Sequence, residues 1–112
     1  MEKERTVLLT VGESDFERLV LESPQPAVVD FSAAWCGPCR SIAPVIDGLA
    51  HDYADRVTVA TVDIDDNPRL AARYGVRSVP TVMLFAGGDV KRVFVGARSA
   101  QEYRKGIDEL LR

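Results

Sequence analysis

The sequence predicts an α/β domain built on one mixed β-sheet with helices on both faces. Two observations carry this prediction: β-branched apolar segments alternate with segments of helical periodicity, and a short glycine-rich turn joins the last two strands. Strands separated by helices pair in parallel, whereas a tight turn joins antiparallel neighbours. The expected order is βαβαβαββα, a five-stranded sheet flanked by four helices, in a single domain over residues 1–112.

The first part of the chain contains the strand that we expect at the centre of the sheet. Residues 27–31 are apolar and rich in valine, which is typical of a strand covered on both faces. A shorter strand is predicted at residues 7–10, followed by a helix. Ser14 lies three residues before Glu17, the spacing of a capping box, and this first helix should end before Pro24.

A longer helix is predicted from about Cys36 to Tyr53, because apolar residues recur there at helical spacing. Pro44 lies inside it and has no amide hydrogen to return to the carbonyl of Arg40, so we expect one kinked helix. A strand rich in β-branched residues should follow at residues 57–64. The buried face of the long helix is expected to consist of Ile42, Ile46, Leu49, Ala50 and Tyr53.

The second half of the chain predicts a short helix, a hairpin and a last helix. Asn67 caps the short helix over residues 68–74, and strands at residues 81–85 and 90–95 form the hairpin. Ser99 and the glutamate three residues later repeat the capping-box spacing at the start of the last helix. Its expected buried residues are Tyr103, Ile107, Leu110 and Leu111.

Composition excludes several classes of function. The chain has 14 Lys and Arg against 17 Asp and Glu, a formal net charge of -3, without a basic cluster that could bind nucleic acid or an anionic membrane. The longest apolar run, residues 82–86, is far shorter than the roughly 20 residues of a membrane helix. The mixed-charge N-terminus lacks the pattern of a secretory signal, so we expect a cytoplasmic protein.

Cys36 and Cys39 are the only cysteines, three positions apart where the central strand gives way to the long helix. A disulfide between them closes a very short loop and stabilises the fold weakly, which favours a chemical role. At a helix N-terminus, free amide hydrogens and the helix dipole stabilise a thiolate by up to about 2 kcal/mol, or roughly 1.5 pKa units. Cys36 is therefore the expected attacking thiol and Cys39, shielded one turn later, the resolving thiol, with Pro38 restricting the backbone between them.

Metal binding is the alternative reading of a cysteine pair. A zinc or iron–sulfur site needs about four soft ligands, whereas the chain offers two cysteines and His51, which we place on the exposed surface of the long helix. We therefore expect no bound metal. The acidic stretch at residues 63–66 lacks the ligand pattern of a calcium loop and is interpreted as a solvated strand end and the approach to the next helix.

The segment Trp35-Cys36-Gly37-Pro38-Cys39, preceded by Val29-Asp30-Phe31 and followed by Val79-Pro80-Thr81, resembles the thioredoxin family. The resemblance covers essentially the whole chain. It implies the thioredoxin fold and a protein disulfide oxidoreductase that works by dithiol–disulfide exchange. It also implies that no cofactor is bound and that NADPH and FAD act only through a partner thioredoxin reductase. The oligomeric state is left open by the sequence, with a monomer as the default expectation.

The resemblance assigns a role to Asp30. In the family this position is a buried carboxylate beneath the second cysteine, which relays the proton of that thiol. A carboxylate within an apolar strand is costly to ionise, so its pKa should rise and it becomes a plausible acid or base. The alternative is an aspartate at the end of the strand, hydrogen-bonded to nearby amides.

The resemblance also predicts a surface for target proteins. Pro80 matches the family's cis proline, which leaves the backbone of Val79 free to pair with an extended peptide. Two positions depart from the best-known bacterial pattern: Ser32 stands where a second tryptophan is common, and Thr61 where a lysine often approaches the carboxylate. The residues expected to surround Cys36 are Trp35, Gly37, Pro38, Val79, Gly96 and Ala97.

Three functions are compatible with this pattern. The leading hypothesis is a general reductase of protein disulfides. A related oxidase or isomerase usually carries histidine in the central dipeptide, where this chain has Gly37 and Pro38. The third is a binding module with an incidental dithiol, as in a thioredoxin that serves as a subunit of a larger assembly.

Overall fold

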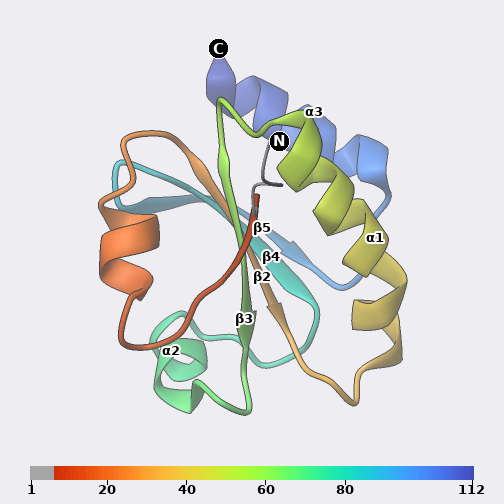
Figure 1. Ribbon diagram of the computed structural model, residues 1–112. Coiled ribbons are helices and arrows are strands. Elements are labelled where there is room, and N and C mark those ends of the chain that lie inside the picture. The colour runs from red at the N-terminus through yellow and green to blue at the C-terminus, as the bar shows by residue number, and fades with distance from the viewer. Residues whose placement is uncertain (1–6) are drawn as a thin grey trace, which may run out of the picture.

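A five-stranded mixed sheet forms the centre of the computed structural model, which describes residues 7–112 (Figure 1). The predicted order of elements is confirmed. In chain order they are β1 (Leu8–Thr10), η1 (Glu17–Leu21), β2 (Ala27–Ser32), α1 (Gly37–Asp52), β3 (Thr58–Asp63), α2 (Pro68–Arg73), β4 (Thr81–Ala86), β5 (Asp89–Val95) and α3 (Ala100–Leu111).

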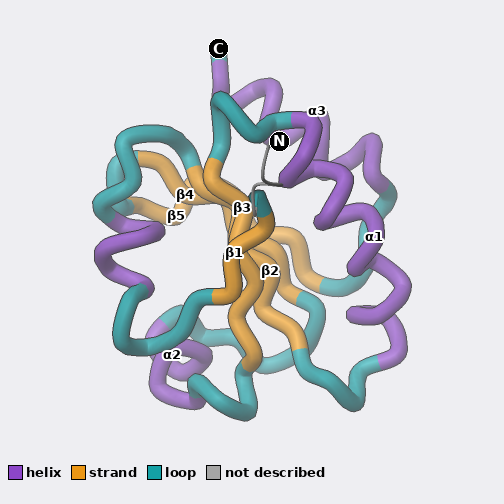
Figure 2. Tube along the Cα trace, viewed as in Figure 1, coloured by secondary structure: helices purple, strands orange, loops and turns teal. Residues whose placement is uncertain are grey.

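Strand β2 lies in the middle of the sheet, as its apolar sequence predicts. The strand order is β1-β3-β2-β4-β5, in which β3 pairs in parallel with β1 and β2, while β4 is antiparallel to both β2 and β5 (Figure 2). Residues 27–31 are all buried. The carboxyl end of β2 leads through residues 33–36 into α1, which places the cysteine pair at the junction of strand and helix.

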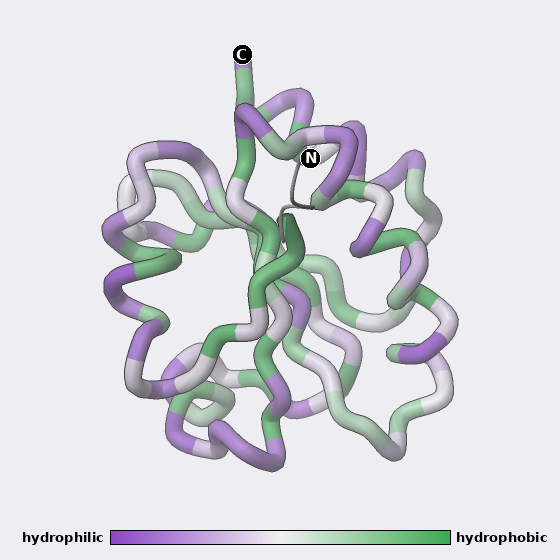
Figure 3. The backbone as a smooth tube through the Cα atoms, in the orientation of Figure 1, coloured by the Kyte–Doolittle hydropathy of each residue, from purple (hydrophilic) through white to green (hydrophobic). Residues whose placement is uncertain are grey.

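The helices cover both faces of the sheet. In Figure 1, α1 and α3 lie on one side and η1 and α2 on the other. Each side has its own hydrophobic core, and apolar residues dominate the strands between them (Figure 3). The first core includes Val28, Ile42, Ile46, Leu49, Phe94, Tyr103 and Ile107, and the second includes Phe16, Val29, Phe31, Leu70, Met83 and Phe85.

Two glycines form the predicted hairpin between β4 and β5. Gly87 and Gly88 have φ angles of 60° and 85°, which residues with a side chain rarely adopt. Two consecutive positive φ angles are typical of the turn that fits the twist of a two-residue hairpin. The pairing shifts register between Leu84 and Phe85, which indicates a bulge in this hairpin.

The capping box predicted at Ser14 and Glu17 is wrong. The helix is a single π-helical turn that begins after Phe16, whose side chain makes no capping hydrogen bond. The carboxylate of Asp15 instead accepts a hydrogen bond from the amide of Gly12, 2.8 Å away, and shapes the turn before the helix. Because Phe16 is buried in the second core, tertiary packing determines where this helix begins. It ends before Pro24, as predicted.

The side-chain cap predicted for α2 is also wrong. Asn67 occupies the N-cap position, but its side chain makes no capping bond. It accepts a hydrogen bond from the amide of Glu13 at 2.9 Å and donates one to the carbonyl of Asp63 at 2.9 Å. The free amide of Arg69 is satisfied by the Glu13 carboxylate, 2.8 Å away. The loop that contains Glu13 therefore caps α2, and no local sequence pattern predicts this contact.

The other two helices agree with the sequence. Helix α1 continues through Pro44 as one element, and its predicted apolar face is buried. Helix α3 begins with the predicted capping box of Ser99 and Glu102, buries Tyr103 and Ile107, and leaves its last two leucines half-buried. Within residues 7–112, no helix combines the length and the apolar character needed to cross a membrane.

Candidate functional site

A disulfide bond joins Cys36 and Cys39 at the start of α1, with Cα atoms 5.3 Å apart. Cys36 has an extended backbone and is the N-cap of the helix, while Pro38 lies in its first turn. Proline is favoured there because an amide hydrogen at this position would have no helical partner. The end of β2 and the start of α1 thus position both sulfurs at one edge of the sheet.

The two cysteines differ in their hydrogen bonding. The amide of Cys39 donates to the sulfur of Cys36, 3.2 Å away, whereas no amide donor reaches the sulfur of Cys39 within residues 7–112. Both residues are buried in this oxidised state, at 4% and 5% exposure, so whole-residue burial does not distinguish them. The donated hydrogen bond, and not exposure, distinguishes Cys36.

The loop before β4 lies against the disulfide. The peptide bond between Val79 and Pro80 is cis, as the family pattern predicts, and the carbonyl oxygen of Val79 lies 3.6 Å from the sulfur of Cys36. The hydroxyl of Thr81 donates to the carbonyl of Ser78 at 2.7 Å, and this hydrogen bond stabilises the loop before β4. Val79 is half-buried, so its backbone borders the disulfide at the surface.

The segment after β5 completes this side of the site. The amide of Gly96 donates to the carbonyl of Pro80 at 2.8 Å and ties the two loops together. Gly96 has a φ of 85°, a backbone conformation that explains the glycine. Ala97 follows it at the surface. The predicted neighbours on this side, Val79, Pro80, Gly96 and Ala97, are therefore brought together.

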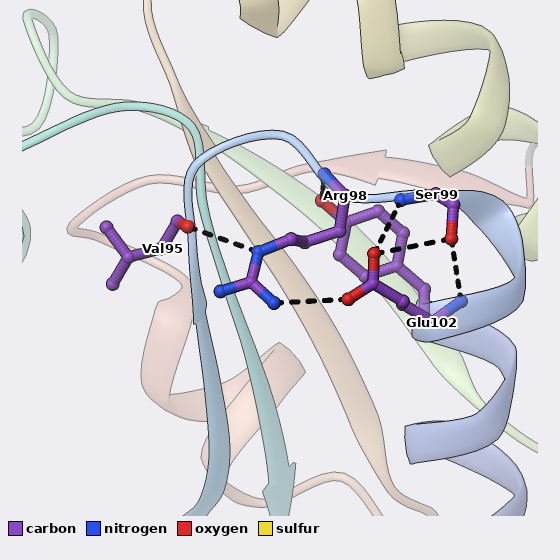
Figure 4. A network of polar contacts seen from close by, with 5 residues as sticks. Val95, Arg98, Ser99 and Glu102 are labelled. Atoms are coloured by element: carbon purple, nitrogen blue, oxygen red, sulfur yellow. Dashed lines mark hydrogen bonds and ion pairs between the residues drawn. The ribbon is translucent and has the colours of Figure 1, made fainter.

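A polar network fixes the same segment to α3 (Figure 4). The guanidinium of Arg98 donates to the carbonyl of Val95 at 3.3 Å and to the carboxylate of Glu102 at 3.2 Å. The amide of Arg98 donates to the hydroxyl of Tyr103 at 3.1 Å. Since the Tyr103 ring is fully buried and packs edge-on against Phe94, this hydroxyl is a rigid anchor for the loop.

Trp35 directly precedes Cys36 in the chain. Its side chain is 66% exposed, and its indole N–H donates to the carboxylate of Asp65, 2.8 Å away. Asp65 lies in a turn that the carboxylate of Asp63 holds by accepting the amides of residues 65 and 66. Residues 63–66 are thus the exposed end of β3 and the approach to α2, as expected, and two of their aspartates also order this side of the site. A hydrogen bond between residues 30 positions apart left no signal in the sequence.

Asp30 is buried in the central strand, with 3% of its surface exposed. By strand alternation its side chain points to the face that α1 covers, near the end where that helix begins. Its Oδ1 atom has no hydrogen-bond partner, which argues against a carboxylate capped by nearby amides. Burial raises the pKa of Asp30 from 3.8 to about 7. A carboxyl group with that pKa can accept or donate a proton near neutral pH.

A cleft of about 360 Å³ opens beside Cys39, with Thr10, Ser32 and Thr61 among its lining residues. Thr61 is the register partner of Asp30 on the neighbouring strand. The position where a lysine is common thus carries a neutral hydroxyl, and burial alone determines the raised pKa of the carboxyl group. The cleft gives solvent a route to the second cysteine.

No metal site accompanies the disulfide in the described part of the chain, where no three His, Cys, Asp or Glu side chains gather in a way that could hold an ion. His51 lies exposed on α1, with its Nδ1 atom 2.9 Å from the carbonyl of Asp47. His51 therefore lies on the exposed surface of α1, as expected from the sequence.

Comparison with known proteins identifies the family. The model of the thioredoxin family matches residues 7–109. The chain belongs to the thioredoxin family. It is 42% identical to a thioredoxin of Acidithiobacillus ferridurans over 104 residues, which cover 93% of this chain and 96% of that protein. It is 48% identical to thioredoxin 1 of Nostoc over 87 residues, 78% of this chain and 81% of the relative.

A plant relative is longer. The M-type chloroplastic thioredoxin of maize is 48% identical over 90 residues, which cover 80% of this chain but 54% of the maize protein. The chain thus spans about half the length of that relative. Thioredoxins are thiol–disulfide oxidoreductases that need no bound cofactor. In this chain, Cys36 and Cys39 form the redox-active disulfide.

Sequence reasoning found the residues next to the sulfurs and missed those that position them. Trp35, Gly37 and Pro38 lie exposed around the disulfide, as expected from the thioredoxin pattern. Asp65 was missed because its partner is distant in sequence. The hydroxyl of Tyr103 was missed because a tyrosine at helical spacing indicates only a core residue. The available signal was chemical: the hydroxyl of a buried tyrosine usually has a hydrogen-bond partner.

Proposed function

We propose that this chain reduces disulfide bonds in target proteins, with Cys36 as the attacking thiol. In the reduced state, the Cys36 thiolate attacks one sulfur of a target disulfide, which forms a mixed disulfide and releases one target sulfur as a thiolate that takes up a proton. Cys39 then loses its proton and attacks the sulfur of Cys36. The second target thiol leaves, and two electrons have passed from the cysteine pair to the target.

The assignment of the first step to Cys36 rests on the hydrogen bond from the amide of Cys39 to its sulfur. A hydrogen bond to the charged form of a group lowers the pKa of that group, and the helix N-terminus adds to the effect. The attacking thiol is also the one beside the Val79 carbonyl, where the backbone of a target peptide can pair.

Asp30 acts in this proposal as the base for Cys39. The carboxylate is buried on the face that α1 covers, and its pKa of about 7 leaves a substantial fraction ionised at neutral pH. It can therefore take the Cys39 proton as that thiol attacks and release it later through the cleft lined by Thr61. The role is that of a general base inside the protein.

The proposal extends to the partners and the location of the protein. After each cycle the disulfide must be reduced again, which calls for a thioredoxin reductase that carries FAD and uses NADPH. We place the monomeric protein in the cytoplasm, because a disulfide reductase requires a reducing compartment. Fractionation of the source cells, with gel filtration of the soluble part, tests the location and the monomeric state.

The experiment that tests the proposal traps the intermediate. The Cys39→Ser variant should accumulate a mixed disulfide with insulin that joins through Cys36, because the resolving thiol is absent. The matched Cys36→Ser variant should accumulate little. Equal trapping by both variants, or trapping through Cys39 alone, contradicts the assignment of roles. Failure of the unaltered protein to reduce insulin in the presence of dithiothreitol contradicts the reductase function itself.

A further inference from the structure

The cleft beside the disulfide opens onto Cys39 and not onto Cys36. It has a volume of about 360 Å³, and its lining residues include Cys39 of α1 and Ser32 at the end of β2. Cys36 does not line it, and the sulfur of Cys36 instead lies 3.6 Å from the carbonyl oxygen of Val79. The two sulfurs of one disulfide therefore have different surroundings.

These surroundings lie on opposite sides of the disulfide. The strand order is β1-β3-β2-β4-β5, and the cysteine pair follows the end of β2. Val79, beside Cys36, leads into β4 on one side of β2, whereas Thr10 and Thr61 line the cleft from β1 and β3 on the other side. A nucleophile attacks a sulfur from the side opposite the bond that breaks. A nucleophile in the cleft is therefore on the side from which Cys39 can be attacked.

Ser32 leaves this cleft open. It is half-buried at the end of β2 and borders the cleft, at the position where a second tryptophan is common in the family. The side chain of tryptophan is far larger than that of serine, so an indole ring here would fill much of the space beside Cys39. At about 360 Å³ the cleft is large enough for a small molecule.

The chemistry of the disulfide also favours attack at Cys39. Attack at one sulfur expels the other as a thiolate, and the more stable thiolate leaves faster. The sulfur of Cys36 accepts a hydrogen bond from the amide of Cys39 at 3.2 Å and lies at the N-terminus of α1, and both features stabilise its thiolate. Within residues 7–112, no amide donor reaches the sulfur of Cys39. Cys36 is therefore the better leaving group.

The charges at the cleft favour a thiol that carries both a carboxylate and an ammonium group. Arg40 lines the cleft, donates one hydrogen bond to the carbonyl of Ala34 at 2.7 Å, and forms no ion pair within the described residues. Its remaining N–H groups can bind a carboxylate. Asp63 and Asp66 line the same cleft and can bind an ammonium group. Cysteine and small peptides that contain it combine these groups with a thiol.

We propose that small thiols of this class enter the cleft and attack the disulfide at Cys39. The proposal goes beyond the reduction of protein disulfides, because it assigns a second reaction to the other sulfur. The small thiolate bonds to the sulfur of Cys39, the bond between the two cysteines breaks, and Cys36 leaves as a thiolate. A second small thiolate then attacks the small-molecule sulfur of this mixed disulfide and releases Cys39. Both cysteines take up protons, the small thiol leaves as its disulfide, and two electrons have passed to the protein.

Trapping with iodoacetamide tests which sulfur is attacked. The oxidised protein is incubated with glutathione and iodoacetamide together, and mass spectrometry locates the glutathione and the carbamidomethyl group. Closure of the internal disulfide and alkylation both use the thiolate that the attack releases, so the ratio of the two trapped products reports the ratio of the two attacks. We expect glutathione on Cys39 with the carbamidomethyl group on Cys36 at least about fivefold more often than the reverse.

Ser32→Trp should close the cleft. It should lower the product with glutathione on Cys39 at least about tenfold and leave the product on Cys36 unchanged, because only access to the first sulfur is lost. Ser32→Ala keeps the cleft open, and Ser14→Trp adds the same ring at an exposed serine outside the cleft, so neither should change the ratio. Insulin reduction with dithiothreitol should stay within about twofold in all three variants, because target proteins react at Cys36.

Arg40→Gln tests the class of thiol. The product with glutathione on Cys39 should form about threefold more slowly, as expected for the loss of one exposed ion pair. The corresponding product with mercaptoethanol, which is uncharged, should form at the same rate. Equal slowing with both thiols overturns the binding of a carboxylate by Arg40.

Each other result decides against the proposal. Glutathione found mainly on Cys36, or on neither cysteine, overturns it and leaves the reduction of insulin intact. An equal fall of both products in Ser32→Trp shows a general disturbance of the disulfide and overturns the role of the cleft. Failure of the unaltered protein to reduce insulin contradicts the proposed function, and it does not change which sulfur glutathione attacks.

Discussion

The amide of Cys39 donates a hydrogen bond to the sulfur of Cys36 over 3.2 Å. Cys36 is the N-cap residue of α1, so its sulfur takes the place that a serine or aspartate oxygen occupies at an ordinary helix start. With two residues between the cysteines, Cys39 lies three positions after Cys36, where its amide can bond to the side chain of the N-cap residue. The same geometry that begins the helix therefore also stabilises a thiolate, and it does so for the first cysteine only.

Replacement of Asp30 by asparagine should stabilise the protein at neutral pH. The pKa of Asp30 is about 7 in the folded protein against 3.8 unfolded, so the folded state binds more protons in this window and loses stability as the pH rises from about 4 to 7. The free energy of unfolding of Asp30→Asn should therefore exceed that of the unaltered protein by about 4 kcal/mol at pH 7. Below pH 4 the two proteins should be equally stable. Urea unfolding at several pH values measures it.

The exposed Asp66→Asn serves as the control for Asp30→Asn and should change stability by less than about 0.5 kcal/mol at any pH. If Asp30 relays a proton, the Asp30→Asn variant should also resolve the mixed disulfide at least about tenfold more slowly near pH 7. A stability difference that is independent of pH would contradict the raised pKa.

Removal of the Tyr103 hydroxyl should weaken target binding. Tyr103→Phe deprives the amide of Arg98 of its acceptor and loosens the loop that carries Gly96 and Ala97. We expect a loss of stability of about 1–2 kcal/mol and a rise of about threefold in the KM for insulin, with an unchanged rate toward small disulfides.

Tyr53→Phe is a matched variant for this comparison. Its hydroxyl donates to the carboxylate of Asp108 at 2.7 Å, at the end of α1 remote from the cysteines. It should lose similar stability while the KM for insulin stays the same. A KM that rises equally in both tyrosine variants would indicate a general effect of stability and would rule out positioning by Tyr103.

Loss of the Asp65 carboxylate should free the indole of Trp35. This is the only tryptophan in the chain, so the intrinsic fluorescence reports on the site alone. Asp65→Ala should lower the fluorescence anisotropy and raise the KM for insulin about two- to fivefold, because the exposed side chain must then be ordered when the target binds. Asp65→Asn, which keeps a carbonyl acceptor, should restore both values.

Two helical glycines should respond to alanine in opposite directions. At Gly48 in α1, an added Cβ would have no neighbour within 4 Å, so Gly48→Ala should stabilise the protein by up to about 1 kcal/mol through helix propensity. At Gly106 in α3, a Cβ would lie 3.0 Å from Phe94 and 3.2 Å from Leu84. Gly106→Ala should cost about 1–3 kcal/mol by overpacking. Stabilisation by both changes, measured by urea unfolding, would contradict the close packing of α3 on the sheet.

Local patterns in the sequence were sufficient for most elements. Periodicity placed α1 between Cys36 and Tyr53, and the spacing of Ser99 and Glu102 placed the start of α3. Both predictions are correct because the interactions on which they depend lie within one helix. At η1 and α2 the same reasoning failed, since the polar groups there bond across the fold, as Glu13 does with the amide of Arg69.

The site divides in the same way. The cysteine motif identifies the reacting sulfurs, and family resemblance places Pro80 beside them. The residues that hold these groups, Asp65 on Trp35 and Tyr103 on the loop of Arg98, act through single contacts that only the three-dimensional arrangement creates. Val93 and Val95 are exposed because β5 is the edge strand of the sheet. Their sequence alone does not distinguish an edge strand from a covered one.

The equilibrium reduction potential of the Cys36 and Cys39 pair tests the reductase function most directly. Equilibration of the protein with defined ratios of reduced and oxidised dithiothreitol, with Cys39→Ser as the control that cannot form the internal disulfide, gives this value. We expect a potential near the family's known value of about −270 mV, below the glutathione pool. A potential at or above about −200 mV would place the pair among isomerases and oxidases and would contradict a reductase.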